Sequence, residues 1–172
     1  MTPRHPLGKI LRDEHGTALH FERELRSAPE RVWRALTESD QLRTWMPCDI
    51  VGPREEGAEV MIPFWDDVAA RYAITEPVLT GRIVTWDPPR RFAWTWDDEL
   101  LTFELEPTAT GTRLTLMVRL GAKGPGAALV GEGYHYCLDQ LIDLVETEAP
   151  HAFLDDDARQ FEQAYAAAEH AH

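Results

Sequence analysis

The stretch from residue 131 to residue 146 constrains the fold more than any other part of the chain. Its apolar residues recur at i, i+4, i+7, i+8 and i+11, which is the spacing of one face of a helix: Tyr134, Leu138, Leu141, Ile142 and Val145. Asp139, Asp143 and Glu146 fall mostly on the other side. A helix is therefore expected from about residue 127 to residue 148, and its stripe needs an apolar surface of matching length.

Three runs of residues before this helix supply such a surface. Apolar and polar residues alternate with period two over residues 91–96, 101–106 and 113–119. The pattern is typical of an antiparallel sheet that is covered on one face only. We therefore expect this sheet to curl around the long helix, with tryptophan and phenylalanine on its inner face.

The first ninety residues predict further strands and two short helices. The expected strands cover residues 7–12, 17–26, 49–52, 57–63, 71–75 and 79–86. Residues 64–67 are interpreted as a loop or turn. Ser27 is predicted to cap the first helix, in a capping box with Glu30, and Thr37 to cap the second, which Pro47 ends.

The length and continuity of the chain predict one domain over residues 1–172. Its core is expected at residues 7–148, with a C-terminal helical extension at residues 150–172. A chain of this size buries about 70% of its unfolded surface, enough for a full core. Within the extension, a last helix is expected from about residue 154 through Ala168, with Phe161 and Tyr165 holding it against the body.

Seventeen basic and thirty acidic residues give a formal net charge of -13. This charge repels nucleic-acid phosphates and anionic membranes, so neither is an expected partner. It is typical of a solubilising surface, and an acidic surface for a basic protein partner is the alternative. No apolar run has the length of a membrane span and no signal-peptide core is present, so a cytoplasmic location is expected. Cys48 and Cys137 are then expected as free thiols, with a disulfide between them as the alternative.

Several short motifs occur together along the chain. Residues 28–37 place a proline, a Val-Trp pair and an Ala-Leu-Thr run in one helix, and residues 42–46 add a Leu-x-x-Trp segment. Residues 81–96 contain a Gly-Arg-Ile-Val strand and a Pro-Pro pair followed by alternating aromatic residues. A Gly-Thr-x-Leu strand follows at residues 111–116, and Gly133 precedes Tyr134 at the start of the long helix.

Together these motifs, over about residues 18–148, resemble the START-like or SRPBCC superfamily, in the branch named after the activator of heat-shock protein 90 ATPase. The resemblance implies an α+β helix-grip fold. In it, a curved antiparallel sheet wraps around a long C-terminal helix, and two short helices follow the first main strand. Members bind sterols, lipids, plant hormones or polyketides, some are cyclases or dioxygenase subunits, and many bacterial members have no known ligand.

The resemblance also implies a ligand cavity between the concave face of the sheet and the long helix. The lining it implies is Phe92, Trp94, Trp96, Leu101, Phe103, Leu105, Leu114, Leu116, Tyr134 and Leu138. The residues expected near its mouth are Trp45, Met46, Phe64 and Trp65. Aromatic linings suit flat or apolar ligands. The alternative is that these side chains simply fill the core, and the sequence leaves both interpretations open.

Two side chains, Arg82 and His135, are candidates for polar groups of this cavity. His135 precedes Asp139 by four residues, so a helical His–Asp pair is one interpretation and a surface or capping histidine is the other. Arg82, with Arg90 and Arg91, suits an anionic head group at the sheet edge, or pairing with surface carboxylates. The chain contains no nucleophile motif and no spacing typical of a metal site, so no catalytic residue, metal or cofactor is expected.

The primary hypothesis is that the protein binds a small apolar or amphipathic molecule without transforming it, as a monomer or homodimer. The second is an enzyme of the cyclase or dehydratase kind that uses the same cavity with His135, Tyr134 or Arg82. The third is a chaperone-linked or regulatory domain whose acidic surface binds a protein partner. These three alternatives differ in whether the cavity, its polar groups or the outer surface carries the function.

Overall fold

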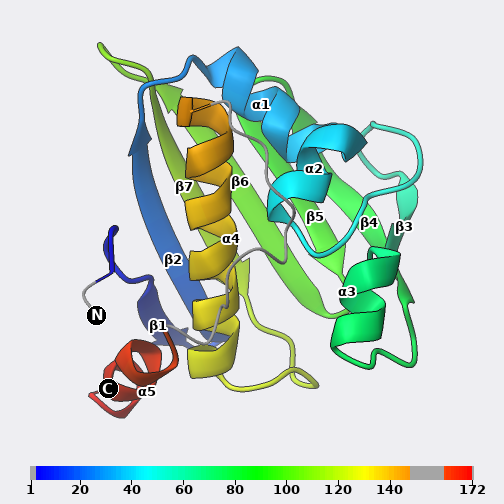
Figure 1. Ribbon diagram of the computed structural model, residues 1–172, viewed down its shortest axis with the longest axis vertical. Helices are drawn as coiled ribbons and strands as arrows, with labels where there is room; N and C mark the ends of the chain where they lie inside the picture. The colour runs from blue at the N-terminus through cyan, green and yellow to red at the C-terminus, as the bar shows by residue number, and fades with distance from the viewer. Residues whose placement is uncertain (1–2, 148–160, 172) are drawn as a thin grey trace.

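The computed structural model describes residues 3–147 and 161–171. The strands are β1 (Lys9–Asp13), β2 (Gly16–Leu25), β3 (Glu59–Pro63), β4 (Val78–Asp87), β5 (Arg91–Trp96), β6 (Glu99–Pro107) and β7 (Thr112–Arg119). The helices are α1 (Pro29–Thr37), α2 (Ser39–Trp45), α3 (Asp66–Arg71), α4 (Ala127–Thr147) and α5 (Glu162–His170). Helices α1 to α4 lie on the same side of the sheet, with α4 running along it (Figure 1).

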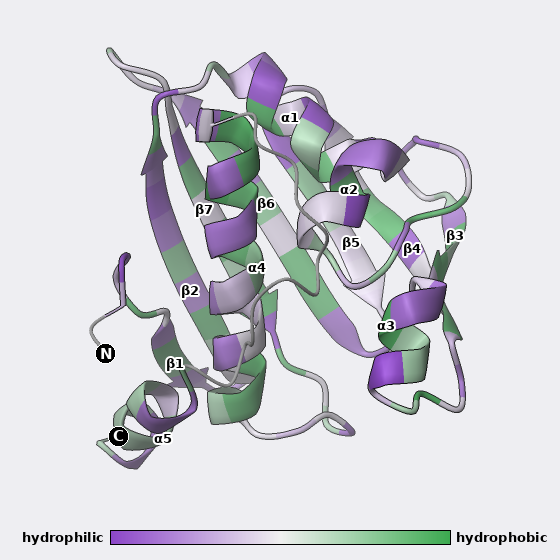
Figure 2. Ribbon diagram, in the orientation of Figure 1, coloured by the Kyte–Doolittle hydropathy of each residue, from purple (hydrophilic) through white to green (hydrophobic). Residues whose placement is uncertain are grey.

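The seven described strands form one antiparallel sheet in the order β1-β2-β7-β6-β5-β4-β3. The predicted alternation over β5, β6 and β7 is confirmed, because Trp94 pairs with Leu101 and Phe103 pairs with Leu116 across the strands. Bands of opposite hydropathy alternate along these strands in Figure 2. The sheet and the long helix together form the helix-grip α+β fold that the sequence predicts.

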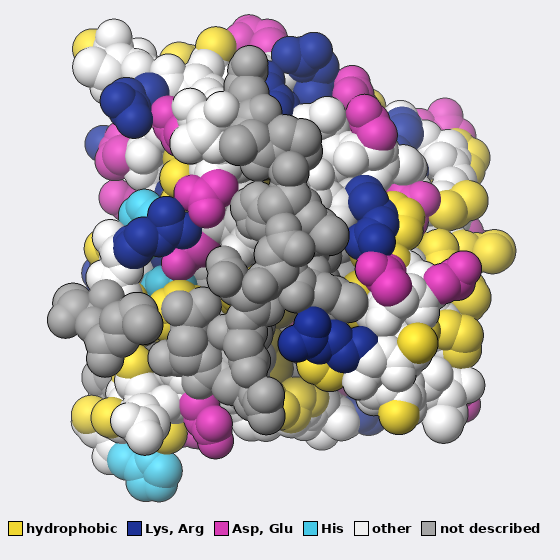
Figure 3. All heavy atoms as spheres, in the orientation of Figure 1, with side chains coloured by type: hydrophobic (Ala, Val, Ile, Leu, Met, Phe, Trp, Pro, Cys, Tyr) yellow, Lys and Arg dark blue, Asp and Glu magenta, His cyan; other side chains and the backbone are white. Residues whose placement is uncertain are grey.

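The surface carries interspersed charges of both signs. On the face shown in Figure 3, basic and acidic side chains lie next to one another over much of the molecule. Arg113 lies 2.6 Å from Glu24, and Arg119 lies 3.1 Å from Asp13. Solvent screens exposed pairs of this kind, so each contributes little to stability.

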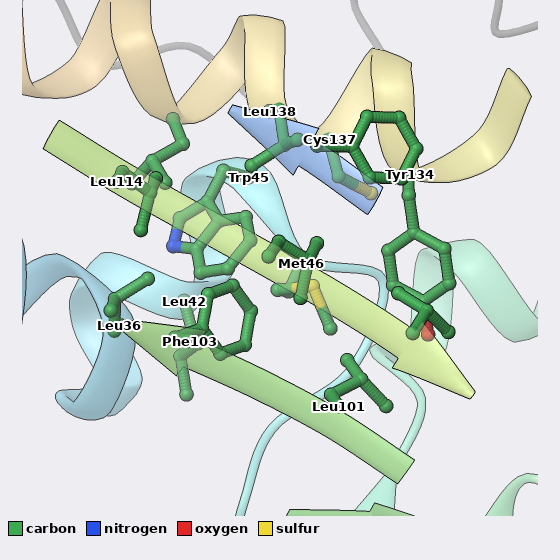
Figure 4. Packing of buried hydrophobic residues seen from close by; sticks show 14 of the residues in the cluster. Leu36, Leu42, Trp45, Met46, Leu101, Phe103, Leu114, Tyr134, Cys137 and Leu138 are labelled. Atoms are coloured by element: carbon green, nitrogen blue, oxygen red, sulfur yellow. The ribbon is translucent and has the colours of Figure 1, made fainter. Parts of the chain in front are cut away.

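The core lies between α4 and the inner face of the sheet, as Figure 4 shows. Leu138 and Leu141 of α4 are fully buried. Trp45 at the end of α2 packs edge-on against Phe103, with ring centroids 6.1 Å apart, and donates its indole N–H to the Ala35 carbonyl at 2.7 Å. The cluster extends from Leu36 at one end to Tyr134 at the other (Figure 4).

Two predicted helix caps are wrong. Ala28 and Glu38 occupy the N-cap positions of α1 and α2, and neither makes a side-chain capping bond. The Ser27 hydroxyl donates instead to the Val145 carbonyl of α4 at 2.6 Å, and Thr37 donates to the Trp33 carbonyl inside α1 at 2.8 Å. Each hydroxyl therefore bonds to a backbone carbonyl in place of a helix N-terminal N–H: Ser27 to one in a distant helix, and Thr37 to one four residues earlier in its own helix.

The segment after β3 also differs from the prediction. Residues 66–71 form helix α3, where a loop and the start of a strand at 71–75 were expected. Asp66 and Asp67 lie in the first turn, where their negative charges interact favourably with the positive end of the helix dipole. Val68 is the buried residue of the helix. The expected strand at residues 49–52 is reduced to isolated bridges on either side of Ile50.

The two ends of the described chain meet beside α4. Helix α5 packs against α4, and β1 lies next to it (Figure 1). Phe161 and Tyr165 are buried there, as the spacing predicts. The predicted start of the last helix at residues 154–157 and the predicted end of α4 at Pro150 lie outside the described residues. Among the helices that the structure describes, none is long and apolar enough to cross a membrane.

Candidate functional site

A pocket of about 720 Å³ lies between α3 and the N-terminal half of α4. We call it the α3–α4 pocket. Its walls are completed by the end of β5 and the start of β6, which meet at the β5–β6 turn, and by the segment after α2. Its described lining consists of Pro47, Phe64, Val68, Arg71, Tyr72, Ile74, Trp96, Glu99, Leu129, Val130, Glu132, Gly133, Tyr134, Tyr136 and Cys137. Tyr72 and Leu129 are 53% and 56% exposed, so apolar surface also reaches solvent at this site.

Aromatic rings form one wall of the α3–α4 pocket. Phe64 and Trp96 lie with their ring centroids 5.6 Å apart and their planes tilted by 48°. The Trp96 indole N–H is buried and makes no hydrogen bond to a described residue. A flat or aliphatic ligand body gains large contact area against such a wall.

Glu99 and Tyr134 form the polar pair of the pocket. The Tyr134 hydroxyl donates to Glu99 Oε2 at 3.1 Å. Burial raises the pKa of the Glu99 carboxyl, the Tyr134 bond opposes this rise, and the nearby charges of Asp98 and Asp97 add to it. Burial and the adjacent Glu99 charge raise the pKa of Tyr134 well above its usual range, so the phenol is a hydrogen-bond donor at neutral pH.

Two glycines of α4 show why space remains on one flank of the helix. A Cβ on Gly131 would lie 2.6 Å from the ring of Tyr165, so α5 packs directly onto that position. A Cβ on Gly133 would have no described atom within 4 Å. Residues two apart on a helix point in nearly opposite directions. We call the side of α4 that carries Gly131 and His135 the closed flank, because α5 covers it. We call the side that carries Gly133 the open flank, and it faces the pocket.

The structure divides the predicted cavity residues between this pocket and the core. Phe64, Trp96 and Tyr134 border the pocket. The others lie elsewhere in the fold: Trp45, Met46, Trp65, Phe92, Trp94, Leu101, Phe103, Leu105, Leu114, Leu116 and Leu138. Most of these are buried because α1, α2 and α4 lie side by side on the inner face of the sheet. Trp65 is half-buried, and its indole N–H donates to the Met46 carbonyl at 2.8 Å.

Sequence reasoning did not identify the residues that α3 and the β5–β6 turn contribute. Val68 and Arg71 come from α3, Tyr72 and Ile74 follow it, and Glu99 begins β6. The strand expected at residues 71–75 places these side chains in the sheet and not beside a ligand pocket. The adjacent acidic residues at positions 66 and 67 are the signal that favours a helix start there.

Arg82 does not reach the pocket. It is exposed, and it lies 3.0 Å from Glu59 Oε1 and donates to the Gly57 carbonyl at 3.1 Å. Ile83 is the buried neighbour on β4, so strand alternation directs Arg82 to the outer face. The prediction that Arg82 is a polar cavity group is therefore replaced by its alternative, pairing with a surface carboxylate.

His135 lies on the closed flank of α4 and not in the pocket. Its ring is fully buried, and Nδ1 lies 2.9 Å from the Tyr165 hydroxyl. The Phe161 ring centroid is 4.1 Å away. Burial lowers the pKa of His135 to about 4, so the imidazole is neutral at pH 7. It is neither a cavity group nor a surface or capping residue, because α5 covers it.

Asp139 is also buried on the closed flank, although its helical position predicted a polar surface. His5 Nδ1 lies 2.8 Å from Asp139 Oδ1, whereas His135 Nε2 lies 3.9 Å from that oxygen, beyond hydrogen-bond distance. Arg23 of β2 is 3% exposed and points inward on the same side. The possible His–Asp pair within α4 is thus replaced by contacts to the N-terminal segment and α5.

The side chains that could ligate a metal ion lie apart from one another in the described part of the chain. Within residues 3–147 and 161–171, no three histidine, cysteine or carboxylate side chains lie close enough together to hold a metal ion. Cys48 and Cys137 are free and buried. Burial raises the pKa of the Cys137 thiol to about 12, so this group of the pocket is not a thiolate at neutral pH.

The sheet, the long helix and the pocket between them define a START-like helix-grip protein. Residues 26–146 match the family described as "Activator of Hsp90 ATPase homolog 1-like protein". This match spans well over half of the chain, and the chain belongs to that family. The resemblance that the short motifs indicate is thereby confirmed.

Solved structures support the same fold. A conserved protein of unknown function from Enterococcus faecalis, EF2215, is 22% identical, with a TM-score of 0.76 over 95% of this chain and 91% of that chain. CalU16 from Micromonospora echinospora is 19% identical, with a TM-score of 0.65 over 95% and 96% of the two chains. Protein CV1439 from Chromobacterium violaceum is 23% identical, with a TM-score of 0.62 over 75% and 97%.

These identities show a shared fold and nothing about a shared ligand. No curated protein sequence matches the chain.

Proposed function

We propose that this protein binds a small apolar or amphipathic molecule in the α3–α4 pocket. The observation that carries the proposal is the pocket itself: about 720 Å³ of space, walled by aromatic and aliphatic side chains around the Glu99–Tyr134 pair. Small-molecule sites typically have volumes of about 300–1,000 Å³ and a mostly apolar lining with a few polar groups. The pocket has both properties.

Binding without chemical transformation fits the lining better than catalysis does. The described lining contains no serine, threonine, histidine or lysine. Its one cysteine has a thiol pKa of about 12. Of the three polar groups that the enzyme hypothesis names, His135 lies on the closed flank of α4 against Tyr165 and Arg82 pairs with Glu59 outside the pocket, so Tyr134 is the one in the described lining. We therefore place binding ahead of the cyclase or dehydratase alternative.

The test is a thermal-shift screen of lipids, flavonoids and polyketide-like aromatics, followed by titration calorimetry of the compounds that raise the melting temperature. Gly133→Phe places a ring in the pocket, where a Cβ meets no described atom, and is expected to remain folded and to weaken binding at least tenfold. Val84→Phe adds the same ring at an exposed site on β4 and serves as the matched control. Equal affinity of Gly133→Phe and the unmodified protein would contradict the proposal.

The cytoplasm remains our proposal for the compartment. It is supported by the buried free thiols of Cys48 and Cys137, since cysteines stay reduced there. Alkylation of both thiols after denaturation of protein purified under non-reducing conditions would support it. A disulfide to another molecule at either position would count against it.

A further inference from the structure

Building on the proposed ligand-binding role, we infer that the α3–α4 pocket selects amphipathic ligands that carry a protonated amine. Glu99 is the group that binds the ammonium, and the aromatic wall holds the apolar body. This inference names the chemical class of the ligand, which the volume and apolar lining of the pocket do not define.

The position of Glu99 supplies a hydrogen-bond acceptor inside the pocket. Glu99 begins β6 and pairs across the strands with Trp96 of the aromatic wall. Oε2 accepts the Tyr134 hydroxyl at 3.1 Å, and Tyr134 is the one hydrogen-bond partner that the described residues give this carboxylate. Oε1 lies beside the turn at residues 121–126, 3.6 Å from where a Cβ on Gly124 would stand. One carboxylate oxygen is therefore available to a donor on the ligand.

The surrounding charge favours a cation at this position. Asp97 and Asp98 precede Glu99 in the β5–β6 turn and act on its carboxyl through their charges. A bound ammonium is attracted by these groups, whereas an anionic ligand is repelled by them.

The basic residue of the described lining lies on its exposed side. Arg71 is exposed at the end of α3, and its guanidinium carbon lies 5.8 Å from the centre of the Tyr72 ring. Tyr72 is itself 53% exposed. Solvent screens a charge at such a position more strongly than one at the half-buried Glu99. The charge of Arg71 is therefore screened more strongly than that of Glu99.

The aromatic wall suits the same ligand class. Trp96 and Phe64 border the pocket, and the faces of such rings attract cations. A charge-assisted hydrogen bond to a carboxylate is stronger than a hydrogen bond between neutral groups. An ammonium on an apolar ring or chain satisfies both contacts at once, and a neutral alcohol of the same shape satisfies neither fully.

The test compares three probes with one ring system: 1-naphthylmethylamine, 1-naphthalenemethanol and 1-naphthoate. Titration calorimetry at pH 7 is expected to show that the amine binds about tenfold more tightly than the alcohol, and that the carboxylate binds most weakly. Glu99→Gln keeps the shape of the side chain and is expected to abolish the preference for the amine, so that the ratio of the affinities for the amine and the alcohol falls to about one. Glu104→Gln, an exposed carboxylate on β6, is the matched control and keeps the preference.

Each outcome distinguishes the inference from the proposed function. Equal affinities for the amine and the alcohol, or tightest binding of the carboxylate, would overturn the amine preference and leave the ligand-binding role intact. A preference that persists in Glu99→Gln would overturn the assignment to Glu99. Failure of all three probes to bind would overturn the inference together with the proposed role of the pocket.

Discussion

The two flanks of α4 carry similar residues with different consequences. On the closed flank, Gly131 lies against Tyr165, and the buried His135 lies 2.9 Å from the hydroxyl of that tyrosine. On the open flank, a Cβ on Gly133 would meet no described atom within 4 Å, and Tyr134 donates to Glu99 beside the pocket. One helix thus seals the fold on one side and leaves room for a ligand on the other.

The difference shows that neighbouring polar groups on a helix do not form one site. The closed flank is covered by remote segments: the backbone N–H of Gly8 donates to the Tyr165 hydroxyl at 2.8 Å, and His5 lies 2.8 Å from Asp139. Polar groups there are held by packing and contribute to stability. Glu99 lines the pocket beside the open flank, Tyr134 is its one hydrogen-bond partner among the described residues, and we propose that it contributes to binding.

The largest expected effect tests the packing of the closed flank. Tyr165→Ala removes a fully buried ring together with its contacts to His135 and Gly8, and we expect a loss of about 3–5 kcal/mol in the free energy of unfolding. Tyr72→Ala, at a side chain that is 53% exposed, is expected to change it by at most about 0.5 kcal/mol. Urea unfolding measures both, and similar losses would contradict the distinction between the flanks.

A pH effect of about 3 kcal/mol is expected from His135. Its pKa falls from 6.5 to about 4 on folding because burial outweighs the charge of Asp139, and Arg23, His5 and Arg4 act in the same direction as burial. The unfolded chain therefore binds the proton more readily, and stability is lost as pH falls from about 6.5 towards 4.

The measurement is the free energy of unfolding between pH 7 and pH 4. His135→Gln is expected to show a correspondingly smaller decrease over this range than the unmodified protein, while carboxylates elsewhere affect both proteins alike. The exposed His15→Gln serves as the control and is expected to follow the unmodified profile. Parallel profiles for His135→Gln and the unmodified protein would show that the buried imidazole does not carry the effect.

The smallest expected effects have opposite signs at the two glycines. Gly131→Ala introduces a methyl group 2.6 Å from the Tyr165 ring and is expected to destabilise the protein by about 1–3 kcal/mol. Gly133→Ala meets no described atom and is expected to stabilise it by about 0.5–1 kcal/mol, because alanine favours a helix over glycine. Thermal unfolding of the Gly131→Ala and Gly133→Ala variants compares the two flanks directly. A loss of stability in both variants would contradict the finding that a Cβ on Gly133 meets no described atom.

Periodicity predicted the sheet and the long helix because both are patterns within one segment. The alternation around Trp94, Phe103 and Leu116 and the stripe around Leu138 define which faces are buried, whatever covers them. The family motifs then predicted how these faces come together. The helix caps were predicted less well, because the Ser27 hydroxyl donates to the Val145 carbonyl of α4, which is far away in the sequence.

The pocket was harder to predict than the fold because it depends on where packing stops. Side chains such as Phe92 and Trp96 alternate identically along β5, yet Phe92 is covered by Trp33 at a centroid distance of 6.0 Å and Trp96 borders the pocket. Sequence periodicity does not encode which of the two positions a distant helix covers. Glu99 likewise carries no motif, and its partner Tyr134 is 35 residues away.

The central claim is that a ligand enters beside the open flank of α4 and leaves the aromatic core unchanged. The chain has six tryptophans, and Trp96 is the one in the described lining of the pocket. Indole ¹⁵N labelling gives one N–H resonance for each, and Trp96→Phe assigns its signal.

Titration with 1-naphthylmethylamine is the most direct measurement. We predict a large shift of the Trp96 resonance, while the signal of Trp45, whose N–H is bonded to the Ala35 carbonyl in the core, stays in place. An unchanged Trp96 resonance at saturating ligand, or a larger shift at Trp45 than at Trp96, would contradict the account.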